Sequence, residues 1–94
     1  MRPKISPAFS KQEAREIRVY LSRFDIPRYL GVRIRRTSKP EHWSGSITFL
    51  KSRDTKRTLP LRIDLTISDL SQLEEAWMHE WNHYLGFKHK DMLT

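Results

Sequence analysis

The chain has 94 residues, a length typical of one small domain with a thin core. It has no cysteine, which excludes disulfides and thiolate zinc sites, so a metal held by histidine and carboxylate could add stability as well as chemistry. Its 18 Lys and Arg against 11 Asp and Glu give a net charge of +7, which favours contact with polyanions such as nucleic acids. No apolar stretch reaches bilayer length, so we expect a cytoplasmic protein with no membrane contact. We also expect residues 1–94 to form a single domain.

A first helix is predicted over about residues 11–23. Ser10 followed by Glu13 has the form of a capping box, which marks the start of a helix. Apolar residues then recur at helical spacing, at Ala14, Ile17, Leu21 and Phe24. Residues 25–31 contain aspartate, proline and glycine, which end the helix.

Three strands are predicted to follow, over residues 32–36, 44–51 and 61–67. The third strand alternates most clearly between apolar and polar residues, with Leu61, Ile63, Leu65 and Ile67 on one face and Arg62, Asp64 and Thr66 on the other. A charged hairpin loop, "KSRDTKRTLP", joins the second strand to the third. This alternation predicts a sheet with one covered face.

A second helix is predicted to begin after a cap at Ser68 or Asp69. Its apolar stripe should pack on the sheet and consists of Leu70, Leu73, Trp77, Trp81 and Tyr84. Gly86 stands where a left-handed residue would end the helix. The order helix, three strands, helix predicts an α+β domain of two layers.

The second helix carries two histidines one turn apart. His79 and His83 are separated by four positions, so their rings share one face of the helix and can bind a single metal ion. At about 100° per residue they lie opposite the apolar stripe, alongside Gln72 and Ala76. Glu80 directly follows His79, near enough to take a proton from a water on the metal but angled away from ligation. Together these residues form the HExxH arrangement.

A third ligand is expected because catalytic zinc is usually held by three protein groups. If the helix ends at Gly86 and the chain folds back, His89 returns to the same ion. Three imidazoles suit zinc, and also nickel, cobalt or copper. The prediction is Zn²⁺ bound by His79, His83 and His89, with Glu80 as the catalytic base.

The run "HEWNHYLGFKH" resembles the elongated zinc-binding motif of the metzincin metallopeptidases, HExxHxxGxxH, at every specified position. The preceding "LRIDLTISDLSQLEEAWMHEWNH" resembles the strand and active-site helix of SprT-like zincin domains, including small ones encoded by phages. The resemblance implies a minimal zincin-like domain of helix, three strands and active-site helix. In such a domain the three histidines bind zinc, and the glutamate is the general base. Water that is activated by the metal hydrolyses a peptide bond of a protein or peptide substrate.

The resemblance also implies that an exposed strand at the edge of the sheet holds the peptide in extended form by main-chain hydrogen bonds. That strand corresponds to residues 44–50, with Ser46, Ile47 and Thr48 as the substrate-binding residues. Metzincins carry a methionine-containing turn beneath the metal, and only five residues follow His89 here. A second subunit or a partner protein is therefore expected to complete the cleft.

Two other interpretations stay open. The YbeY family of metal-dependent ribonucleases shares the spacing HxxxHxxGxxH, although its motif has glycine where this chain has Glu80. Basic residues of the sheet and its loop could bind nucleic acid without reading its sequence: Arg33, Arg35, Lys51, Arg53, Lys56, Arg57 and Arg62. Alternatively the metal serves a non-catalytic zinc-binding module for interaction with a partner, in which a further protein ligand would fill the fourth position.

Overall fold

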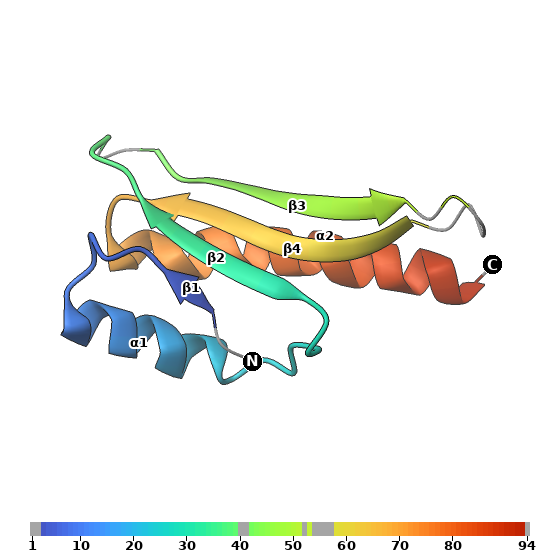
Figure 1. Cartoon of the computed structure of the whole chain (residues 1–94), viewed down its shortest axis with the longest axis horizontal. Coiled ribbons are helices and arrows are strands. Elements are labelled where there is room, and N and C mark those ends of the chain that lie inside the picture. Colours follow the sequence, from blue (N-terminus) through green and yellow to red (C-terminus); the bar gives the residue numbers. More distant parts are fainter. Residues whose placement is uncertain (1–2, 40–41, 52, 54–57, 94) are drawn as a thin grey trace.

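The sheet of the domain has four strands, and both helices lie on one of its faces (Figure 1). The computed structural model describes residues 3–39, 42–51, 53 and 58–93, with residues 87–93 described by their backbone only. The elements in chain order are β1 (Lys4–Ile5), α1 (Lys11–Leu21), β2 (Gly31–Arg36), β3 (Ser44–Lys51), β4 (Thr58–Ile67), the short 3-10 helix η1 (Leu70–Gln72) and α2 (Leu73–Leu93). The predicted two-layer α+β class is confirmed.

Helix α1 begins at the predicted capping box. The Ser10 hydroxyl accepts a hydrogen bond from the Glu13 N–H at 3.1 Å, and the Ser10 N–H donates to the Glu13 carboxylate at 2.9 Å. Ile17 and Leu21 of this helix are buried in the core. The helix ends at Leu21, slightly earlier than predicted, and Phe24 packs edge-on against the tryptophans of α2 from the loop that follows.

The sheet has one strand more than the three predicted. β1 pairs in parallel with β2, with Lys4 beside Arg33 and Ile5 beside Ile34. It is only two residues long, so no alternation could reveal it in the sequence. β2 pairs in parallel with β4, and β3 pairs antiparallel with β4. The strand order is therefore β1-β2-β4-β3, which leaves β3 at an edge.

The core lies between the helices and the strand residues that alternate toward them. Those at the centre of the sheet are fully buried: Ile34, Ile63, Leu65 and Ile67. Leu61 belongs to the same apolar series, but its side chain is 46% exposed, so its predicted place in the core is wrong. The register shifts opposite this residue, because Thr48 pairs with Arg62 and Phe49 with Pro60, so Leu61 is left out of the pairing and its neighbour Pro60 is buried instead.

Helix α2 packs on the sheet through the predicted stripe. Leu73, Trp77, Trp81 and Tyr84 are buried, and Leu70 of η1 is partly buried. Of the two predicted caps, Asp69 is the one used, because its carboxylate accepts the Leu70 N–H at 2.8 Å. α2 continues without a break to Leu93, so the predicted end at Gly86 is wrong. Neither helix, over the residues described, is long and apolar enough to span a bilayer.

Candidate metal centre beside the edge strand

Two histidine rings meet on the solvent side of α2. His79 Nε2 and His83 Nε2 are 3.2 Å apart, one ring donating a hydrogen bond to the other, and the ring centroids are 4.7 Å apart. Both residues are exposed. Two nitrogens on a tetrahedral zinc, each about 2.0–2.1 Å from the ion, lie about 3.3 Å from one another. The separation of the two nitrogens therefore matches that of two ligands on one ion, which they could bind once they give up the hydrogen bond between them.

Glu80 lies on the inner side of this pair. It is the only charged residue that is buried among those whose exposure the structure describes, at 5%. Its Oε1 is 3.9 Å from His79 Nε2, which is close but too long for a hydrogen bond. The carboxylate thus faces the imidazole pair without being held by it.

The side of α2 that bears Glu80 packs against β3, and this corrects the predicted surroundings of the histidines. Ala76, one turn before Glu80, is completely buried, although it was expected beside the histidines on the exposed face. The reason is that α2 contacts both β3 and β4, so the buried arc of the helix is wider than its apolar stripe. Glu80 consequently lies at the boundary between the core and the exposed histidines.

Two residues near the start of β3 form the wall opposite the helix. A Cβ on Gly45 would lie 2.7 Å from Glu80 Cγ and 2.9 Å from Glu80 Oε1, so only glycine lets the strand approach the carboxylate this closely. The Trp43 ring packs edge-on against the His79 ring, with centroids 5.5 Å apart. Sequence reasoning missed both residues. A glycine inside an apolar strand pattern was the available signal for the first, since it marks a close approach of another group.

The chain does not fold back after Gly86. This glycine is not in the left-handed region, and a helix can accommodate a single glycine at a cost of about 1 kcal/mol. On a continuous helix, position 89 is about 9 Å beyond position 83 along the axis and about 120° away around it. The side chain of His89 lies outside the described residues, so its role as a ligand stays a prediction. Among the side chains described, no group of three or more His, Cys, Asp or Glu could hold a metal ion.

The predicted substrate strand, β3, does lie at the edge of the sheet. Ser46, Ile47 and Thr48 pair with Asp64, Ile63 and Arg62 of β4 on one side only. The pairing is regular from Ser44 to Thr48, and the register shifts between Thr48 and Phe49. The other side of this regular stretch has no strand neighbour in the described part of the chain, so its main-chain groups are available to an added strand. Binding of a peptide there stays a prediction.

The aromatic residues of the predicted stripe lie in the core, and the one histidine outside α2 lies at the surface. Trp77, Trp81 and Tyr84 belong to the core, and His42 is exposed. The Tyr84 hydroxyl is 2.8 Å from the Tyr29 hydroxyl, and burial, followed by this hydrogen bond, raises the pKa of Tyr84 well above its usual range. A hydroxyl held protonated in this way suits a structural role.

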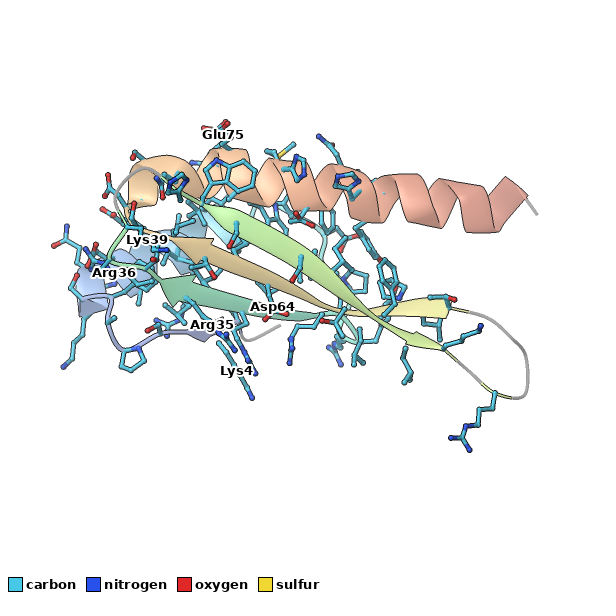
Figure 2. All side chains as sticks on the ribbon, turned by 90° about the horizontal axis from the view of Figure 1, so that it is seen from above. Lys4, Arg35, Arg36, Lys39, Asp64 and Glu75 are labelled. Atoms are coloured by element: carbon cyan, nitrogen blue, oxygen red, sulfur yellow. The ribbon has the colours of Figure 1, made fainter. Side chains whose placement is uncertain are left out.

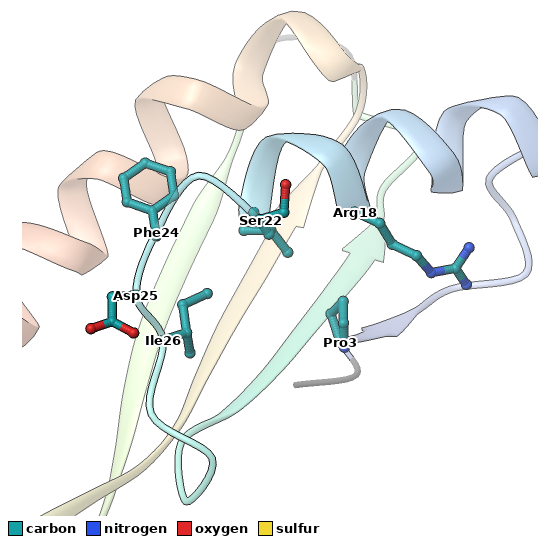
Figure 3. Close-up of a pocket in the computed structure, with 7 residues that line it drawn as sticks. Pro3, Arg18, Ser22, Phe24, Asp25 and Ile26 are labelled. Carbon is teal, nitrogen blue, oxygen red and sulfur yellow. The ribbon is translucent and has the colours of Figure 1, made fainter.

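A larger hollow than any beside His79 and His83 lies elsewhere, at the end of α1. It encloses about 680 Å³ and includes Arg18 and Asp25, which Figure 3 shows on opposite sides of it. Both of these residues are exposed, and no buried polar side chain lines the hollow. It offers no group for chemistry, so size does not identify the functional site here.

No protein-family model, curated protein or solved structure matches this chain. The roles of the site residues therefore rest on the HExxHxxGxxH spacing and on the geometry around His79, His83 and Glu80.

Proposed function

We propose that the chain is a zinc-dependent peptidase that acts in the cytoplasm. The observation that carries the proposal is the pair of imidazole nitrogens 3.2 Å apart, with the buried Glu80 carboxylate 3.9 Å from one of them. A solvated helix face rich in histidine would not require a buried carboxylate beside it, because burying an ionisable group is costly. The absence of cysteine is consistent with a reducing compartment.

His79 and His83 would hold the zinc, and Glu80 would act as the base. When bound, zinc polarises a carbonyl and lowers the pKa of water toward about 7. Glu80 accepts the proton of the attacking water and passes it to the leaving amine. Gly45 keeps this carboxylate against the strand, and the Trp43 ring limits the rotation of the His79 ring.

The substrate would be a protein or peptide that adds to the free edge of β3. The regular stretch from Ser44 to Thr48 passes directly over Glu80 at Gly45, so a peptide bond held along that edge lies near the base. Ser46, Ile47 and Thr48 would bind it through main-chain groups. The cleft has no second wall among the described residues, and a second subunit or a partner would supply it.

The third ligand requires a change in α2. For His89 to join His79 and His83, the helix must open near Gly86, where the missing side chain makes backbone reversal least costly. We expect zinc to induce this opening, because metal binding can drive local folding when a ligand is otherwise out of place.

The test is Glu80→Gln, compared with Glu75→Gln on an exposed part of the same helix (Figure 2). Casein cleavage by the zinc-loaded parent should stop on chelation, and Glu80→Gln should lower it by about 10²-fold or more while zinc binding persists. Glu75→Gln should cleave as the parent does. His89→Ala should weaken zinc binding and abolish any loss of helical circular dichroism that zinc causes in the parent.

Each contrary result has a defined meaning. A Glu80→Gln variant that cleaves as fast as the parent would show that Glu80 is not the catalytic base. Cleavage of RNA instead of protein identifies a ribonuclease, and zinc binding without turnover in the parent identifies a non-catalytic module. Either of these last two outcomes would overturn the proposal that the chain is a peptidase.

A further inference from the structure

Basic residues are concentrated in the sheet, and acidic residues in the helices. The four strands contain one acidic residue, Asp64, and six basic ones: Lys4, Arg33, Arg35, Arg36, Lys51 and Arg62. The two helices contain five basic residues and six acidic ones. The net positive charge of the chain therefore comes largely from the sheet and its loops.

Four of these basic residues lie on the face of the sheet that no helix covers. Strand alternation directs Val32 and Ile34 into the core and Arg33 and Arg35 to the opposite face. The register then places Lys4 beside Arg33 and Arg33 beside Asp64, while Arg62 lies on the same face of β4. Figure 2 shows Lys4 and Arg35 extending from the sheet on the side away from α2. Lys4, Arg33, Arg35 and Arg62 form what we call the uncovered basic face.

The single carboxylate on this face lies between two of the guanidinium groups and accepts a hydrogen bond from one of them. Asp64 accepts a hydrogen bond from Arg62 Nε at 2.9 Å, and its other oxygen is 3.8 Å from Arg33 Nε. Each guanidinium uses only its Nε, so its two terminal nitrogens stay available to an external anion. The side chains of Lys4 and Arg35 have no hydrogen bond or ion pair with any residue that the structure describes. Among the described residues, the face thus has one hydrogen-bonded cation, one that is paired more loosely, and two whose side chains have no partner.

The surroundings of these cations fit phosphates better than bases. A hollow of about 450 Å³ on this face is lined by Arg35, Arg62 and Asp64 and by the hydroxyl residues Ser44, Ser46, Thr48 and Thr66. Arginine and small hydroxyl residues are typical contacts of nucleic-acid phosphates. None of the residues that line the hollow is aromatic, whereas binding of a single strand usually relies on stacking of its bases on aromatic rings.

We infer that the uncovered basic face binds the phosphodiester backbone of a nucleic-acid duplex, without reading its sequence. The uncovered basic face lies on the other side of the sheet from α2 and its histidines (Figure 2), and it shares only the edge strand, through Ser46 and Thr48, with the proposed peptidase site.

The experiment measures binding of a fluorescent DNA duplex of about 20 base pairs by anisotropy, at increasing salt. The variant Lys4→Glu/Arg35→Glu should weaken binding about tenfold or more and reduce the slope of log affinity against log salt by about 2, the value for two lost phosphate contacts. The matched control is Lys11→Glu/Arg15→Glu, which changes the net charge equally but on exposed positions of α1. It should change the affinity by less than about twofold, because charges farther away than about 8 Å are screened at physiological salt.

Four results would overturn the inference. These are equal weakening by the two double variants, no duplex binding by the parent near physiological salt, tighter binding of the single strand, and equal binding of vesicles of anionic lipid. If Lys4→Glu/Arg35→Glu does not fold, judged by circular dichroism, the neutral variant Lys4→Gln/Arg35→Gln takes its place with the same expected ranking. Zinc binding should be the same in all of these variants.

Discussion

The two faces of the sheet are formed by the same strands but differ in burial and in what their side chains contact. On the covered face, Ile34, Ile63 and Leu65 have no exposed surface and hold the helices in place. On the other face, the residues between them, such as Arg33 and Asp64, remain partly exposed, and Asp64 pairs with both Arg33 and Arg62. Neighbouring positions of one strand therefore support the fold on one side and, in our proposal, bind nucleic acid on the other. Substitutions on one face should leave the property of the other intact.

The strongest test of this separation replaces two residues of β4 that face opposite ways. Ile63→Ala should lower the free energy of unfolding by about 2–5 kcal/mol, because it leaves a cavity in a fully packed core. Thr66→Ala, on the uncovered face, should lower it by less than about 1 kcal/mol. Urea denaturation of both variants measures the difference. Similar losses would mean that the uncovered face also supports the fold.

The same division explains which parts of the structure the sequence could predict. Ser10 with Glu13, the alternation over residues 62–67 and the stripe at Trp77 and Trp81 are local signals, and all were confirmed. β1 was not predictable, because two residues carry no period and the strand exists only through pairing with β2.

The candidate site was predictable only in part, for a similar reason. The approach of His79 to His83 follows from helical spacing alone, and it is present. The burial of Glu80 and the contact of its side chain with Gly45 depend on where β3 crosses α2, which no local pattern states. The prediction that α2 ends at Gly86 was wrong, because a glycine permits the chain to reverse direction without forcing it to do so.

Gly45 lies where the covered face meets the proposed site, and its substitution should have an effect of intermediate size. In Gly45→Ala the added methyl would lie within 3.0 Å of three atoms of the Glu80 side chain, which must then move from its position beside His79. We expect peptide turnover to fall about tenfold or more, since a small displacement of a catalytic group is costly, while zinc affinity stays within about twofold.

Gly31→Ala is the matched control, because its nearest atom would be 3.4 Å from the new methyl, an ordinary contact. It should turn over substrate as the parent does. Parent-like turnover in Gly45→Ala would show that the position of Glu80 does not depend on this glycine.

The smallest expected effect concerns the helix layer at its rim, where α1 begins. Hydrogen bonding of the Glu13 carboxylate to the Ser10 N–H, and then to the Ser10 hydroxyl, lowers the pKa of Glu13 from its ordinary value of 4.5, with Arg36 at 3.3 Å acting in the same direction. A carboxyl whose pKa is lower in the folded state binds its proton more readily in the unfolded chain. Its stabilising contribution is therefore complete above the unfolded pKa and disappears as the pH falls through the folded one.

Glu13→Gln should accordingly melt slightly below the parent at neutral pH, and the difference in Tm should shrink below the ordinary pKa of the carboxyl and vanish once the pH has fallen through the lowered pKa of the folded state. Glutamine can still accept the Ser10 N–H, so the helix start itself is kept and only the charge is removed. Glu16→Gln changes an exposed carboxylate of α1 outside the capping box. This variant should lose stability on acidification to the same extent as the parent. A Tm difference between Glu13→Gln and the parent that persists unchanged into acid would assign the effect to packing and not to the ionised capping box.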